Sequence, residues 1–146
     1  MVTVDYGATA EELLELYREY GWWDDREESD VRRALRSTDE VVLLRTGSEA
    51  GSGEPVAAAR ILTDYVYYAM VYDVIVAADR RGTGVGRELM TAVREHPRLR
   101  EVSPSLLARE GLVPFYESCG FDAADEAVDH PDGEPEPLVW MVHGRE

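Results

Sequence analysis

The sequence predicts a single α+β domain with a mixed β-sheet. Its length of 146 residues suits one hydrophobic core. Apolar stretches of strand length outnumber the helical ones, and they form hairpin-like pairs in the first half of the chain. A strand–turn–helix–strand unit occupies the second half. Such a succession places antiparallel and parallel neighbours in one sheet, so we expect one domain over residues 1–146.

The first half predicts two short helices among four strands. Thr9 and Glu12 have the spacing of a capping box, and an apolar helical stripe follows as far as Gly21, which ends the helix. The acidic segment 24–30 is expected to be a connection to a second helix that ends near Ser37. Strands are expected at residues 2–4, 41–44, 56–62 and 66–77, with a polar loop at 46–55.

The second half is organised around a glycine-rich turn at residues 80–86. A helix is expected from about Val85 to Glu95, because Pro97 ends the pattern. Pro114 is tolerated in the first turn of another helix that reaches Ser118. Further strands are expected at residues 102–108, 121–124 and 138–142, with an acidic, proline-rich loop at 125–137.

The charge balance excludes several classes of partner. The chain has 30 acidic residues against 15 basic ones, a formal net charge of −15, and all 15 cations are arginine. Such a surface repels phosphates, so nucleic-acid binding is not expected. Two interpretations of the acidity stay open. It is either a general solvation device, as in halophilic proteins from salt-adapted cytoplasms, or an attractor for cationic substrates.

The cysteine content and the hydropathy of the chain bear on metal binding and on membrane association. Cys119 is the only cysteine and is expected to be a small buried residue. Together with the three histidines it gives no recognised ligand spacing, so no metal is expected. The sequence has no leader pattern and no run of roughly 18 apolar residues, so we expect a soluble cytoplasmic protein with no membrane partner.

The glycine turn is the most informative segment. Gly82, Gly84 and Gly86 let backbone N–H groups approach a phosphate where the next helix begins. Arg81 and Arg87 can add charge-assisted hydrogen bonds. The glycine pattern fits either a cradle for a pyrophosphate or a tight turn with no ligand. A P-loop is excluded because the chain has no lysine, and a Rossmann site is excluded by the Gly-x-Gly-x-Gly spacing.

Two motifs in this half resemble one known family. The segment Arg81-Gly-Thr-Gly-Val-Gly86 is similar to the Gln/Arg-x-x-Gly-x-Gly/Ala signature of motif A in the GNAT superfamily of N-acetyltransferases. Residues 106–121 end in Phe-Tyr-Glu-x-x-Gly-Phe and resemble motif B, in the family's order. The resemblance implies the GNAT fold, a mixed, mostly antiparallel central sheet of about six to seven strands flanked by about four helices.

The resemblance also implies acetyl-CoA as cosubstrate. Residues 74–76 would pair with the pantetheine arm as a neighbouring strand does, and residues 81–87 would hold the pyrophosphate. Arg109 stands where the family often has an asparagine, so it would replace that contact to the pantetheine. The cofactor-binding residues implied are Val74, Ile75, Val76, Arg81, Gly82, Thr83, Gly84, Val85, Gly86, Arg87 and Arg109.

The implied reaction is acetyl transfer to the primary amine of a small molecule or protein by direct attack. Tyr116 occupies the family's tyrosine position, and a phenol with a pKa of about 10 can protonate a leaving thiolate. Alternatively, Tyr116 packs with Phe115. A backbone N–H near Val76 can stabilise the oxyanion.

The amine has a pKa of about 10.4 and must lose a proton before it attacks. Asp73, at the start of the implied pantetheine strand, could orient or deprotonate it. Alternatively, its carboxylate accepts backbone N–H bonds. Asp64 and Glu27 are weaker candidates for the base.

Aromatic residues could wall an amine pocket, since ring faces attract cations. The candidates are Trp22, Trp23, Tyr65, Tyr67, Tyr68 and Tyr72. Two other functions remain open: a non-catalytic acyl-CoA-binding regulatory module with the same fold, and an adaptor that works through its acidic face. Members of the family are often dimers, so a homodimer is possible, and the oligomeric state stays open.

Overall fold

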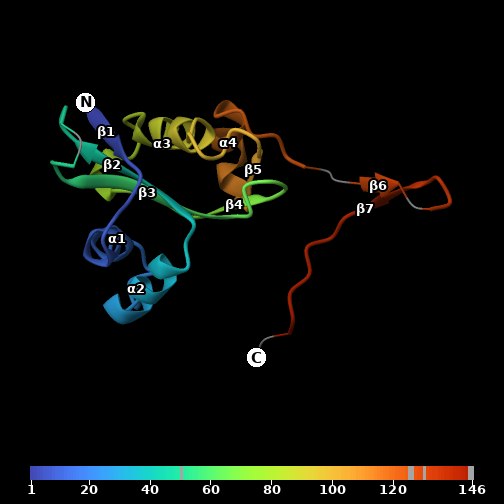
Figure 1. Cartoon of the computed structure of the whole chain (residues 1–146), viewed down its shortest axis with the longest axis horizontal. Coiled ribbons are helices and arrows are strands. Elements are labelled where there is room, and N and C mark those ends of the chain that lie inside the picture. Colours follow the sequence, from blue (N-terminus) through green and yellow to red (C-terminus); the bar gives the residue numbers. More distant parts are fainter. Residues whose placement is uncertain (50, 125–126, 130, 145–146) are drawn as a thin grey trace. The chain divides into compact units, whose positions relative to one another are not determined.

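The computed structural model describes residues 1–49, 51–124, 127–129 and 131–144. The chain divides into two compact units, Met1–Leu107 and Ala108–Glu146. Among the described residues, five strands form one sheet, and all five belong to the first unit (Figure 1). They are β1 (Val2–Asp5), β2 (Glu40–Thr46), β3 (Pro55–Thr63), β4 (Ala69–Val76) and β5 (Pro104–Leu106).

The sheet is mixed and mostly antiparallel. Its order is β1-β2-β3-β4-β5, so each strand pairs with its neighbour in the sequence. The first three pairings are antiparallel, whereas β5 joins β4 in parallel after a helical crossover. The predicted fold class is therefore confirmed.

Three α-helices of the first unit cover the sheet. They are α1 (Ala10–Tyr17), α2 (Glu28–Arg36) and α3 (Val85–Arg94), the last preceded by the 3₁₀ turn η1 (Ala78–Arg80). Figure 1 shows α1 and α2 on one side of the sheet and α3 on the other. Leu13, Leu16 and Tyr17 of α1 pack in one core cluster with Leu43 and Ile75 of the sheet. This core is what holds α1 against β4.

Local signals explain where the first two helices begin. The capping box at the start of α1 is formed as predicted, with the Glu12 N–H donating to the Thr9 hydroxyl oxygen and the Thr9 N–H to the Glu12 carboxylate. Helix α2 begins at Glu28, inside the segment that was expected to be a connection. Acids in its first turn and arginines in its last complement the helix dipole, so the charged run favours a helix there.

Strand β4 begins later than predicted, because a turn takes up residues 66–68. The Asp64 carboxylate accepts the N–H groups of Val66, Tyr67 and Tyr68, and Tyr65 has a φ of 64°. Backbone groups held by this side chain are withdrawn from the sheet ladder.

The second unit contains the 3₁₀ turn η2 (Glu110–Leu112), helix α4 (Val113–Ser118) and a hairpin of β6 (Ala127–Asp129) with β7 (Pro135–Pro137). Pro114 lies in the first turn of α4, as predicted. Neither 121–124 nor 138–142, both described, forms a strand, whereas β6 and β7 lie in the segment expected to be a loop. The central sheet thus has five strands among the described residues rather than six to seven, because an apolar segment becomes a strand only where an edge pairs with it.

Candidate functional site

Strand β4 carries a bulge just before the glycine turn. Tyr72 pairs with Arg60 and Ile75 pairs with Ala58, so two residues of β4 oppose one residue of β3. One of these two residues of β4 is Asp73, whose φ is 54°. A bulge interrupts the ladder and re-aims the strand, here directly upstream of the segment predicted to bind the pantetheine arm.

The carboxylate of Asp73 is surrounded by three donors, and we call Tyr17, Arg26, Arg60 and Asp73 the Asp73 clamp. Arg26 donates from Nη1 to Oδ2 at 2.8 Å and from Nη2 to Oδ1 at 3.3 Å. Arg60 donates from Nε to Oδ2 at 2.8 Å, and the Tyr17 hydroxyl donates to Oδ2 at 3.4 Å. Both oxygens are therefore engaged, in a side chain that is only 9% exposed.

The clamp shifts the acid–base behaviour of its members. Burial alone would raise the pKa of Asp73, but the hydrogen bond from Arg26 and the charges of Arg60 and Arg26 outweigh it and lower that pKa. Burial, followed by the charge of Asp73, raises the pKa of Tyr17 to about 12. The carboxylate is therefore an anion at neutral pH and a weak proton acceptor.

The segment between α1 and α2 lies against the same strand. The guanidinium of Arg26 stacks on the rings of Tyr17 and Trp23, 4.8 Å from each centroid. Tyr20, Trp22 and Trp23 form an aromatic cluster with ring centroids 5.8 to 6.0 Å apart. Within this cluster, Trp22 is 54% exposed.

Tyr20 connects this segment to the glycine turn. Its hydroxyl donates to the carbonyl oxygen of Val76 at 3.0 Å. Arg81 donates from Nε to the Tyr20 oxygen at 3.0 Å, and its guanidinium lies 4.3 Å from the ring centroid. Two of the residues assigned to the cofactor from the sequence, Val76 and Arg81, thus share one tyrosine.

The glycine turn has the backbone that a phosphate cradle needs. Gly82 has a φ of 77°, and Gly84, the residue that caps α3, has a φ of 90°. A Cβ built on either would meet no atom within 4 Å, so the space beside both is open. Gly84 provides no side-chain cap to the ten-residue α3, so the N–H groups of its first turn keep an open approach for an anion.

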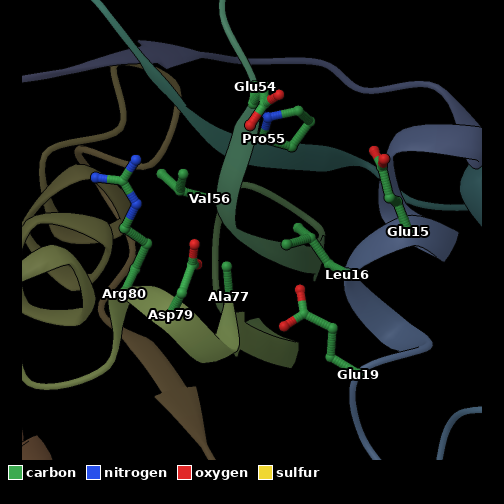
Figure 2. Close-up of a pocket in the computed structure, with 9 residues that line it drawn as sticks. All are labelled: Glu15, Leu16, Glu19, Glu54, Pro55, Val56, Ala77, Asp79 and Arg80. Atoms are coloured by element: carbon green, nitrogen blue, oxygen red, sulfur yellow. The ribbon is translucent and has the colours of Figure 1, made fainter.

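An acidic pocket of about 200 Å³ lies beside η1, just before this turn in the sequence (Figure 2). The carboxylates of Glu15, Glu19, Glu54 and Asp79 line it, with Arg80 as the one cation among its lining residues. Glu19 also accepts the N–H of Ala78 at 2.7 Å, at the start of η1. This concentration of negative charge disfavours a pyrophosphate here, so the open glycine side is where the residues fit one.

The other site residues predicted from the sequence do not belong to the Asp73 clamp. Tyr116 and Arg109 belong to the second unit, where Tyr116 meets the ring of Phe115 edge-on at 5.1 Å. Asp64 holds the turn before β4, and its three backbone hydrogen bonds lower its pKa. Glu27 caps α2 without a side-chain hydrogen bond to it.

The predicted aromatic wall is not a single cluster. Trp22 and Trp23 lie beside the Asp73 clamp, whereas Tyr65, Tyr67 and Tyr68 belong to the turn before β4, at the end of the strand away from the glycines. The Tyr65 hydroxyl donates to the Glu40 carboxylate instead. Only the two tryptophans and Tyr72 thus remain near the bulge.

Sequence reasoning missed the partners of Asp73. Arg26 and Arg60 lie 47 and 13 residues away from it along the chain, and no local motif connects them. One signal was available, because Arg60 interrupts the apolar stretch of β3, and a cation in a buried strand requires an anionic partner.

Comparisons with known proteins agree on one family. The model of the acetyltransferase (GNAT) family matches residues 9–121. The chain is 36% identical over 126 residues to serotonin N-acetyltransferase 2, chloroplastic, of Oryza sativa subsp. japonica, which covers 86% of this chain and 60% of that protein. It is 29% identical over 123 residues to an uncharacterized N-acetyltransferase of Pyropia yezoensis, covering 84% of this chain and 66% of the relative. The chain therefore spans less than two thirds of the length of both.

Solved structures give the same result. A putative GNAT-family acetyltransferase from Xanthomonas campestris has a TM-score of 0.69 and 26% identity, over 85% of this chain and 86% of that one. A GNAT-family acetyltransferase from Streptococcus pneumoniae has a TM-score of 0.67 and 26% identity, over 84% and 88%. Among the residues that the structure describes, no helix is long and apolar enough to cross a membrane.

Proposed function

Because the chain belongs to the acetyltransferase (GNAT) family, we propose that it transfers the acetyl group of acetyl-CoA to a primary amine by direct attack. The observation that carries this proposal is the open start of α3. Gly84 has a φ of 90° there, with no atom within 4 Å of a Cβ built on it. Backbone donors in that position suit a pyrophosphate, and they follow a bulged strand after η1 and the glycine turn.

The residues present fit acetyl-CoA, which supplies an activated acyl thioester when bound. Residues 81–87 would hold its pyrophosphate, and Val74, Ile75 and Val76 would pair with the pantetheine arm. We assign Arg109 to the same arm. A backbone N–H near Val76 would donate to the carbonyl oxygen on which negative charge develops.

Tyr116 is the proposed general acid. Its phenol would give a proton to the departing thiolate. We propose that residues 1–146 form one catalytic domain. Asp73 is the proposed neighbour of the amine.

The acceptor is proposed to be a small molecule or a protein with an exposed primary amine. The similarity to a serotonin N-acetyltransferase adds amines with an aromatic ring to the candidates. The cluster of Tyr20, Trp22 and Trp23 beside β4 supports this, because its exposed indole can stack on a ring or face a cation.

The test is a screen for CoA release from acetyl-CoA. The panel comprises serotonin, polyamines, aminoglycosides, amino acids and N-terminal peptides, with and without molar KCl. Acetylated product must be identified by mass spectrometry. We expect turnover of at least one class. Tight acetyl-CoA binding without turnover of any amine would instead support the non-catalytic module, and no binding at all would contradict both.

A further inference from the structure

The Asp73 clamp joins the segment between α1 and α2 to the bulge of β4. None of the steps proposed above uses it. We propose that Asp73 is a positioning residue that fixes the amine-side segment 18–27 and the cofactor-side strand 74–76 relative to each other. This inference rests on the proposed function for what is positioned, and its test includes a measurement that does not.

The backbone of Asp73 requires the clamp. A residue with a Cβ is strained at a φ of 54°, although aspartate tolerates this region better than most residues. Such conformations persist only where the surroundings hold them. Here Arg60 holds the carboxylate from the neighbouring strand, and Arg26 holds it from across the α1–α2 segment. The bulge is therefore maintained by side chains as well as by the sheet.

The same contacts fix the segment between the helices at two points of β4. Arg26 binds Asp73 and also stacks on Trp23. Three residues further along β4, Val76 accepts the hydroxyl of Tyr20. Trp22 is exposed, lies between these two anchors in the sequence and packs edge-on against Trp23. An amine seated on this aromatic cluster would then face residues 74–76 in one orientation.

The geometry favours this role over that of a general base. A base must present a free oxygen to the amine or to one intervening water. Both oxygens of Asp73 already accept from Arg26, and Oδ2 accepts from Arg60 and Tyr17 as well. A proton on either oxygen would neutralise the charge on which the ion pairs with Arg26 and Arg60 depend. Its lowered pKa agrees with this geometry.

The test compares Asp73→Asn, Arg26→Gln and the double variant with the wild type. Asparagine adopts positive φ as readily as aspartate, so Asp73→Asn removes the charge without adding backbone strain. The matched control is Arg45→Gln, which removes a similarly buried ion-pair cluster with Asp5 and Glu12 that is remote from β4. The wild type and all four variants are assayed for amine KM, kcat, the pH profile of kcat, and acetyl-CoA affinity by calorimetry.

We expect amine KM to rise by roughly 10- to 100-fold in both single variants, as misplacement of about 1 Å can cost that much. In the double variant, amine KM should rise no further than in the more strongly affected single variant, because both changes break the same interaction. The pH profile should keep its shape, and Arg45→Gln should resemble the wild type. Hydrogen exchange should show that the amides of residues 18–27 lose protection in the clamp variants alone.

Two results would overturn the proposal. If Asp73→Asn lowers kcat by about 10²–10⁴-fold and removes the acid limb of the profile while Arg26→Gln leaves both intact, Asp73 is the base. If residues 18–27 keep their hydrogen-exchange protection in the clamp variants, or lose it equally in Arg45→Gln, Asp73 positions nothing. If the wild type acetylates no amine, the proposed function is refuted. The hydrogen-exchange measurement needs no amine, so it would still decide the role of the clamp.

Discussion

Tyr116 lies in α4 with aromatic rings on two sides, Phe115 at 5.1 Å and Phe121 at 6.2 Å between centroids. Tyr116→Phe keeps this packing and removes only the hydroxyl. If that hydroxyl protonates the thiolate, kcat should fall by about 10²–10⁴-fold while acetyl-CoA affinity changes little. Steady-state CoA release and calorimetry measure the two quantities. Tyr67→Phe, at a tyrosine 78% exposed in the turn before β4, is the control.

A Tyr116→Phe enzyme with near wild-type kcat on a good acceptor would make Tyr116 a packing residue. The thiolate would then leave unassisted or through water. The alkaline limb of the wild-type profile gives a second criterion, because it should vanish in the variant if it reports this phenol.

His96 predicts an acid-sensitive stability. The side chain is 2% exposed, its Nδ1 accepts the N–H of Arg98 at 3.1 Å, and burial lowers its pKa. The folded state therefore binds a proton at His96 less tightly than the unfolded chain, in which a histidine has a pKa of about 6.5. The free energy of unfolding should fall as pH drops below about 6.5, and His96→Gln should reduce that slope. Urea denaturation across this range measures it, with His143→Gln as the exposed control.

At the scale of elements, the glycine turn makes a sharp prediction. Valine at position 84 would place a branched side chain in the open space before α3 and would strain a backbone at a φ of 90°. Loss of a helix-terminus anion site worth up to about 2 kcal/mol corresponds to acetyl-CoA binding that is weaker by up to roughly 30-fold in Gly84→Val. Calorimetry measures the affinity, and circular dichroism checks the fold.

The matched control for this variant is Gly47→Val. Gly47 has a similar φ of 97° and the same open surroundings, but it lies in the loop after β2. Both variants should lose comparable stability, and only Gly84→Val should lose acetyl-CoA. Equal affinity in the two variants would contradict the phosphate assignment.

Elements with strong local signals could be predicted from the sequence. The capping box placed α1 correctly, and the glycine spacing placed the turn before α3. Elements that depend on a distant partner could not. The apolar residues 138–142 have a strand pattern but no paired edge in the structure, and Asp64 diverted residues 66–68 into a turn. For the same reason, Asp73 was found as a candidate residue while its arginine partners were not.

At the scale of the whole molecule, the net charge of −15 predicts salt-dependent stability. The Debye length falls from about 30 Å at 0.01 M to about 3 Å at 1 M salt, so repulsion among the carboxylates is progressively screened. The melting temperature should rise steadily with KCl toward molar concentrations. Calorimetric scans with sucrose at equal osmolality control for solute exclusion. A flat or falling curve would mean that the acidity serves a local purpose, such as attracting a cationic substrate.

The arginines of the Asp73 clamp have one more consequence. Arg26 and Arg60, like Arg81 on the ring of Tyr20, carry guanidinium groups, and the chain has no lysine. A guanidinium stays protonated at any physiological pH and is no nucleophile toward a thioester. A protein that acetylates amines would otherwise risk modifying its own ion pairs and neutralising them. This sequence has no side-chain amine that the proposed reaction could acetylate, so the charges of its ion pairs would stay unmodified.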